Sequence, residues 1–139
     1  MSAAVAKRII VGYDGSDSAR RALDRAAELA GYGTTVTVVS VAPPAYSAGL
    51  PAGADAADVQ RARELLAEAR DALALRQVSV TTLDPIGSAA EQIVLAADEL
   101  GADLVVVGSR NGHAEERAVL GSTSTKVLHH APCDVLVVR

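Results

Sequence analysis

The sequence predicts an α/β protein built on a single open, five-stranded parallel sheet with helices on both faces. Short apolar segments rich in β-branched residues alternate with amphipathic segments whose apolar residues recur every three or four positions. Strands separated by helices must run parallel, because the right-handed crossover connection is almost obligatory. With 139 residues and no visible repeat or linker, the chain fits one domain spanning residues 1–139.

The first part of the chain predicts a strand, a helix and a second strand. Residues 8–13 form a short apolar run that ends in a turn, and Ser16 or Asp17 can cap the following helix. That helix carries apolar residues on one face and ends near Gly31. Residues 34–41 predict the second strand. The proline- and alanine-rich stretch 43–54 that follows predicts a loop.

The middle of the chain predicts a long helix, an edge strand and a third helix. Residues 56–75 place apolar side chains on one helical face. Residues 78–83 alternate apolar and polar side chains, which is typical of a strand with one solvated face. Residues 87–100 have helical periodicity, and Gly101 ends this helix.

The last part predicts two apolar strands joined by a loop and a short helix. Residues 104–107 are apolar on both faces, as in a strand covered by helices on each side. The segment from Val135 to Val138 has the same character, and residues 123–130 form the helix between the two strands. A last strand of this kind would leave an apolar edge bare unless another strand paired with it.

Composition excludes several classes of function. A net charge of -4 with scattered arginines lacks the basic face that covers nucleic-acid backbone, and the absence of Phe and Trp removes stacking platforms. No apolar run approaches the roughly 20 residues that cross a bilayer. Cys133 is the single cysteine, and the residues before Arg8 form no signal-peptide-length apolar stretch. We therefore expect a cytoplasmic protein with a small-molecule partner, and neither nucleic acid nor membrane as a partner.

Two loops are candidates for binding. Open parallel sheets bind ligands beyond the carboxyl ends of the strands, where strand order reverses. The loops to consider follow the first strand, at 14–18, and the fourth strand, at 108–124. The second loop enters a helix through Gly121 and a run of hydroxyl residues, a pattern typical of an anion site. A plainly capped helix, with Ser122 as the cap and Gly121 as the turn residue, explains the local pattern equally well.

A longer pattern resembles a known family. Gly108-Ser109-Arg110-Asn111, then nine residues, then Gly121-Ser122, running on to the segment APCDVLVV at 131–138, is similar to the carboxyl-terminal signature of universal stress proteins. The opening segment IIVGYDGS at 9–16 resembles that family's first strand and acidic turn. The resemblance implies a sheet order of 3-2-1-4-5, ATP lying across the first and fourth strands, and a homodimer formed through the last strand, Val135 to Val138.

The resemblance also implies the residues that bind the nucleotide. Asp14 would lie near the ribose or a bound magnesium ion, Val41 would contact the adenine, and the glycine-rich loop would hold the phosphates. The implied cofactor-binding residues are Asp14, Val41, Gly108, Arg110, Asn111, Gly112, Gly121, Ser122, Thr123 and Ser124.

The loop departs from the family's pattern at one position. Nucleotide-binding members carry Gly, two residues, Gly, nine residues, Gly, then Ser or Thr, whereas this chain has Asn111 at the second glycine and Gly112 one place later. Asn is the non-glycine residue that best tolerates left-handed backbone, so the turn can survive. Glu115 and Glu116 add negative charge beside a polyphosphate, offset in part by neighbouring arginines.

The sequence thus predicts a dimeric, ATP-binding stress or regulatory protein. No nucleophile–base pair is evident, so we expect at most slow ATP hydrolysis. Two alternatives predict the same fold. One is a nucleotide-independent protein-interaction module, which Asn111 and the acidic loop favour; the other is a receptor for cyclic AMP, which the same phosphate loop would hold.

Overall fold

The computed structural model describes residues 6–109 and 120–139 and confirms the predicted fold class. Its principal strands and helices alternate in chain order, with one short hairpin inserted after the second strand. The elements are β1 (Arg8–Gly12), α1 (Asp17–Leu29), β2 (Thr35–Val39), β3 (Tyr46–Ser47), β4 (Leu50–Pro51), α2 (Ala56–Ala74), β5 (Ser79–Leu83), α3 (Ala89–Leu100), β6 (Leu104–Gly108), α4 (Ser122–His130) and β7 (Asp134–Val138).

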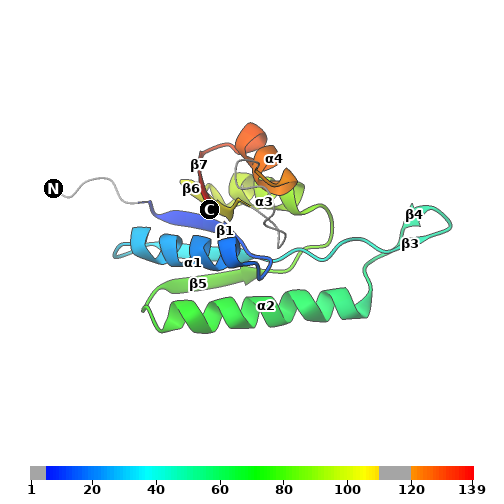
Figure 1. Cartoon of the computed structure of the whole chain (residues 1–139), viewed down its shortest axis with the longest axis horizontal. Helices are drawn as coiled ribbons and strands as arrows, with labels where there is room; N and C mark the ends of the chain where they lie inside the picture. The colour runs from blue at the N-terminus through cyan, green and yellow to red at the C-terminus, as the bar shows by residue number, and fades with distance from the viewer. Residues whose placement is uncertain (1–5, 110–119) are drawn as a thin grey trace.

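The five long strands form one parallel sheet in the order β5-β2-β1-β6-β7 (Figure 1). Counted as the five strands of the sheet, this is the predicted order 3-2-1-4-5. The strand order reverses between β1 and β6, because β2 lies on one side of β1 and β6 lies on the other. The carboxyl ends of β1 and β6 therefore frame the crevice in which open α/β sheets bind ligands.

Two separate apolar cores cover the two faces of the sheet. Helices α1 and α2 pack on one face against alternate residues of the central strands, and α3 and α4 pack on the other face against the intervening residues. Ile9 and Val11 face the first core, whereas Ile10 faces the second, as the two-residue period of a strand requires. The core consists largely of Val, Ile, Leu and Ala side chains, because the chain has no Phe or Trp.

Several predicted boundaries differ from the structure by one or two residues, and two of these differences concern the candidate binding residues. β2 ends at Val39, so Val41 lies two residues beyond the strand. α4 begins at Ser122 with Gly121 as its N-cap, so the interpretation of Ser122 as the cap was wrong. Gly121 takes this position in extended backbone, at φ -68° and ψ 163°, a conformation open to any residue.

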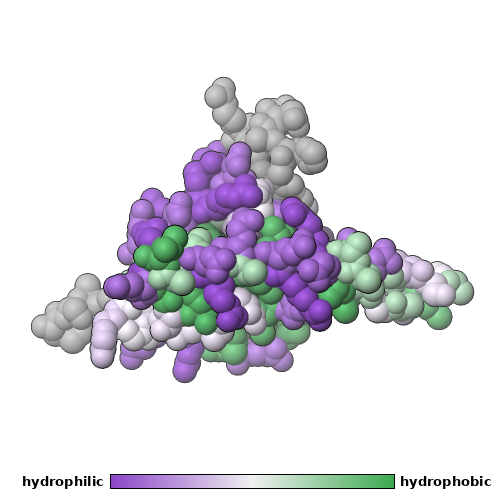
Figure 2. Space-filling view, turned by 90° about the horizontal axis from the view of Figure 1, so that it is seen from below, coloured by the Kyte–Doolittle hydropathy of each residue, from purple (hydrophilic) through white to green (hydrophobic). Residues whose placement is uncertain are grey.

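The stretch 43–54, predicted as a loop, contains a short hairpin. Tyr46 pairs with Pro51 and Ser47 with Leu50, and the two residues between them, Ala48 and Gly49, both have positive φ. Positive φ at both central residues is typical of the tight two-residue turn that best joins antiparallel strands. The sequence did not indicate this turn, because alanine rarely adopts positive φ. The hairpin projects from the body as an arm, and its tip is white to green in Figure 2 (Figures 1 and 2).

The helices of the described segments are all too short or too polar to cross a lipid bilayer.

Candidate functional site

A cavity of about 120 Å³ lies in the crevice at the carboxyl ends of β1, β2 and β6. It is bounded on one side by the loop after β1 and on the other by the first turn of α4. The lining residues are Gly12, Tyr13, Asp14, Ala19, Val39, Ser40, Val41, Leu65, Ala89, Ile93, Val107, Gly108, Ser109, Gly121, Thr123 and Ser124. The wall is mostly apolar, with one carboxylate and a few hydroxyl groups, which is the usual composition of a small-molecule site.

Asp14 is the one carboxylate of the lining, and a local turn fixes its loop. Its Oδ1 accepts a hydrogen bond from the backbone N–H of Ser16 at 3.0 Å, which is an Asx turn. The Ser16 hydroxyl in turn accepts a hydrogen bond from the backbone N–H of Ala19 at 3.2 Å and so caps α1. The second Asp14 oxygen has no hydrogen-bond partner among the described residues, and the side chain is exposed at the mouth of the cavity.

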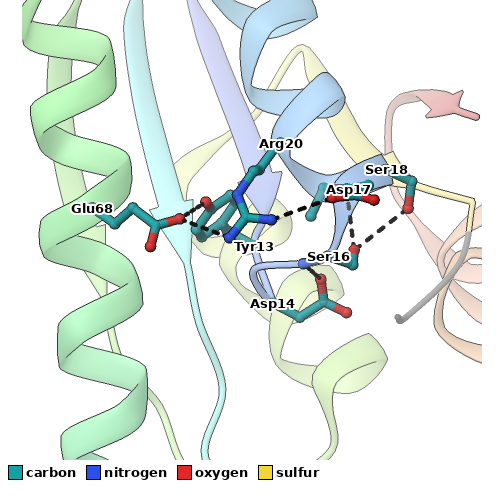
Figure 3. A network of polar contacts seen from close by, with 8 residues as sticks. Tyr13, Asp14, Ser16, Asp17, Ser18, Arg20 and Glu68 are labelled. Carbon is teal, nitrogen blue, oxygen red and sulfur yellow. Dashed lines mark hydrogen bonds and ion pairs between the residues drawn. The ribbon is translucent and has the colours of Figure 1, made fainter. Parts of the chain in front are cut away.

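Tyr13 ties this loop to α2, as Figure 3 shows. Its hydroxyl donates a hydrogen bond to Glu68 Oε1, and its side chain is only 4% exposed. Burial, the hydrogen bond to Glu68 and the negative charge of that carboxylate raise the pKa of Tyr13 to about 12. Arg20 of α1 also donates to Glu68 Oε1, at 3.4 Å, and to Asp17 at 3.4 Å. The Glu68 carboxylate of α2 therefore joins that helix both to the loop after β1 and to α1.

Gly108 ends β6 where α1 begins to pack on it. A Cβ at this position would lie 2.5 Å from Ser18 Oγ and 2.7 Å from the backbone N of Ala19. Only a residue without a side chain lets the first turn of α1 approach so closely. The glycine requirement at this position thus follows from packing of the helix, independently of any phosphate.

The first turn of α4 faces the cavity from the opposite side. The Gly121 N–H donates to the Ser109 carbonyl at 2.6 Å, and the buried Ser124 hydroxyl donates to the Gly121 carbonyl at 3.0 Å. The backbone N–H groups of Ser122, Thr123 and Ser124 belong to the first turn of α4, so they have no acceptor within the helix. Three N–H groups and the positive end of the helix dipole form an electropositive end that suits an anion.

The structure brings most of the predicted residues together. Asp14, Val41, Gly108, Gly121, Thr123 and Ser124 line the cavity, whereas Ser122 is exposed beside it. Arg110, Asn111 and Gly112 lie outside the described residues. The sequence analysis missed Tyr13, Leu65, Ile93 and Glu68, because helix and strand periodicity assigns such residues to a core or a solvated face without showing which of them meet at the crevice.

Metal ligands are sparse in this region. Within residues 6–109 and 120–139, no three His, Cys, Asp or Glu side chains gather closely enough to hold a metal ion. Magnesium is commonly held by one or two carboxylates together with ligand phosphates and water, so Asp14 fits the role of a single protein ligand to a nucleotide-bound ion.

Comparison with known proteins shows a family match over nearly the whole chain. The model of the universal stress protein family matches residues 6–139. A universal stress protein of Thermus aquaticus is 38% identical over 137 residues, covering 96% of this chain and 98% of that protein. The universal stress protein of Archaeoglobus fulgidus in complex with dAMP has a TM-score of 0.78 and 26% identity, with 98% of this chain and 100% of that chain covered.

A universal stress protein in complex with cAMP has a TM-score of 0.75 and 28% identity, with 98% of this chain and 99% of that chain covered. The similarity therefore extends over nearly the whole chain, and includes both loops that frame the cavity. With its sheet order and its sequence in agreement, the chain belongs to the universal stress protein family.

Proposed function

We propose that the protein binds an adenine nucleotide, ATP in particular, in the crevice between β1 and β6, and acts as a dimeric stress-response or regulatory protein. One observation carries the proposal: a single carboxylate, Asp14, and the N-terminal turn of α4 line the same cavity from opposite sides. Relatives of the same fold are solved in complex with dAMP and cAMP, which share the adenine and a phosphate with ATP; the sugar is ribose in cAMP, as in ATP, and deoxyribose in dAMP.

The phosphates would bind the backbone of the α4 turn. The N–H groups of Ser122, Thr123 and Ser124 supply the donors, and the Ser122 and Thr123 hydroxyls can add to them. The hydroxyl of Ser124 already donates to the Gly121 carbonyl, so this residue would contribute its N–H and not its side chain. Gly108 would contribute mainly by letting α1 and β6 approach each other.

The base and sugar would lie toward β1 and β2. Val41, with Val39 and Ile93, gives an apolar wall suited to the adenine ring. Asp14 accepts hydrogen bonds, which suits ribose hydroxyl groups, and it can hold a magnesium ion that the phosphates share.

The dimer would form through β7. This strand pairs with β6 on one side only, and the side chains of Val135, Leu136, Val137 and Val138 are all half-buried in the single chain. An apolar edge strand with unpaired N–H and C=O groups favours pairing with a second strand. Sedimentation velocity of Val137→Lys against the parent protein tests this: we expect the dimer to dissociate, and an unchanged dimer would reject β7 as the interface.

Calorimetric titration tests the nucleotide. Protein stripped of nucleotide is titrated with ATP and magnesium, with ADP, AMP and cyclic AMP as comparators. We expect saturable ATP binding near one site per chain, lost in Gly121→Leu, whose backbone conformation any residue can adopt. Lys126→Ala, on the same helix but outside the cavity lining, is the matched control and should bind normally. Normal ATP binding by folded Gly121→Leu would reject the site.

Cyclic AMP is the second candidate, favoured by the relative solved in complex with it. The same titration separates the two, because a cyclic AMP receptor would bind cyclic AMP far more tightly than ATP and without magnesium. Binding of no nucleotide would instead favour the interaction module that Asn111 suggests.

A further inference from the structure

Helix α2 holds the loop that carries Asp14, although no residue of α2 belongs to the family's motif. Glu68 of α2 accepts hydrogen bonds from Tyr13, directly before Asp14, and from Arg20, in the second turn of α1. These two residues bracket Asp14 in the chain, as Figure 3 shows. One carboxylate therefore contacts the chain on both sides of Asp14.

A second contact from the same helix supports the first. Gly15 has φ +80°, and a Cβ built there would lie 2.7 Å from Leu65 Cδ2, so the loop rests directly on α2. Leu65 and Glu68 are three residues apart and share one face of the helix. Leu65 also lines the cavity. The position of α2 is thus coupled to the position of the Asp14 loop and to the cavity wall.

The two hydrogen bonds to Glu68 differ in strength. Tyr13 is buried, so its hydroxyl loses water on folding and depends on Glu68 as its acceptor, and a bond to a charged acceptor is stronger than one between neutral groups. The Arg20–Glu68 pair has side chains 52% and 48% exposed, which makes it a weak surface ion pair. The Tyr13–Glu68 bond is therefore the main tether.

We propose that Glu68 is a positioning residue for ligand recognition: through Tyr13 it holds the Asp14 carboxylate where that carboxylate accepts hydrogen bonds from the ribose hydroxyls of a bound nucleotide. This inference rests on the proposed function. Glu68 touches no ligand itself, so its effect must depend on Asp14 and on the hydroxyl groups that Asp14 binds.

Paired titrations separate positioning from a general structural role. Glu68→Ala and Tyr13→Phe are titrated with ATP and with 2′,3′-dideoxy-ATP, which lacks both ribose hydroxyls. We expect ATP to bind about tenfold more weakly to each variant. With magnesium left out of both titrations, the dideoxy analogue offers Asp14 no hydroxyl group, and its affinity should change by at most about twofold. An equal loss for both ligands would overturn the proposal, since it would mean that the whole cavity is disturbed.

Asp84→Asn is the matched control. Asp84 pairs with Arg63 of α2 at 3.3 Å, so the variant also removes an ion pair between α2 and another segment, but at a position outside the cavity lining. It should bind both ligands like the parent protein. In an Asp14→Ala background, Glu68→Ala should cause no further loss of ATP affinity; a full additional loss would show that Glu68 acts independently of Asp14, contrary to the proposal.

A readout without ligand keeps the two proposals distinguishable. If the parent protein binds no nucleotide, the proposed function fails, and amide hydrogen exchange of residues 13–17 decides the positioning role alone. Faster exchange of this segment in Glu68→Ala, with the Asp84→Asn pattern unchanged, supports it. Unchanged exchange in Glu68→Ala overturns it.

Discussion

Substituting Gly108 by alanine should destabilise the protein more than any other glycine-to-alanine change at the crevice. The added Cβ would lie 2.7 Å from two backbone atoms of Ser18 and Ala19, about 0.7 Å inside the 3.4 Å at which ordinary contact begins. Backbone at the start of a helix cannot move aside by changing rotamer, so α1 itself must shift. Overpacking of this kind costs about 1–3 kcal/mol, and we expect the upper end of that range.

Gly12 provides the comparison at the neighbouring strand. A Cβ there would lie 2.6 Å from Ile93 Cδ1, but this atom is the end of a flexible side chain that can rotate away. We therefore expect Gly12→Ala to stay within about 1 kcal/mol of the parent protein. Urea unfolding followed by far-ultraviolet circular dichroism measures both variants. A Gly108→Ala protein as stable as the parent, or less damaged than Gly12→Ala, would refute the packing argument.

Three further predictions concern stability. The Asp103 carboxylate accepts hydrogen bonds from two backbone N–H groups where β1 begins, and these bonds lower its pKa. The contribution of Asp103 to the free energy of unfolding is therefore complete above the ordinary Asp pKa of about 3.9, and it is lost as the pH falls through the lower pKa of the folded protein. Urea titrations from pH 7 to pH 2 should show the stability difference between parent and Asp103→Asn shrinking toward acid, and a constant difference would contradict this. Ser124→Ala removes a buried hydroxyl donor and should cost about 1 kcal/mol in the same assay, whereas no loss would mean that the bond is unimportant. Leu50→Ser, in the exposed tip of the arm, should change the unfolding free energy by less than about 0.5 kcal/mol, and a larger loss would show that the arm packs on the body.

The sequence predicted the sheet and its four helices because hydrophobic period and strand composition are local signals. It located Gly101, the left-handed residue that ends α3, for the same reason. It missed the β3–β4 hairpin, since Ala48 adopts positive φ against its own preference and the strands are only two residues long. Hydrophobic periodicity does not reveal a turn that is held by only a few backbone pairings.

The candidate site was predicted in part. Asp14 and the α4 turn were found because they stand in recognisable loops. Glu68 and Tyr13 were not, because they lie 55 residues apart in the chain and only the packing of α2 beside β1 brings them together. Gly108 also has a role that the sequence could not show, because the close approach of α1, a contact between distant segments, requires a residue without a side chain there.

The hydrogen bond between the Ser109 carbonyl and the Gly121 N–H closes the base of the segment between β6 and α4. The end of β6 and the start of α4 are therefore joined directly, through backbone atoms of described residues. This short backbone link keeps the α4 turn in register with β6, so the two sides of the crevice are aligned by the sheet itself and not by side chains that a substitution could remove.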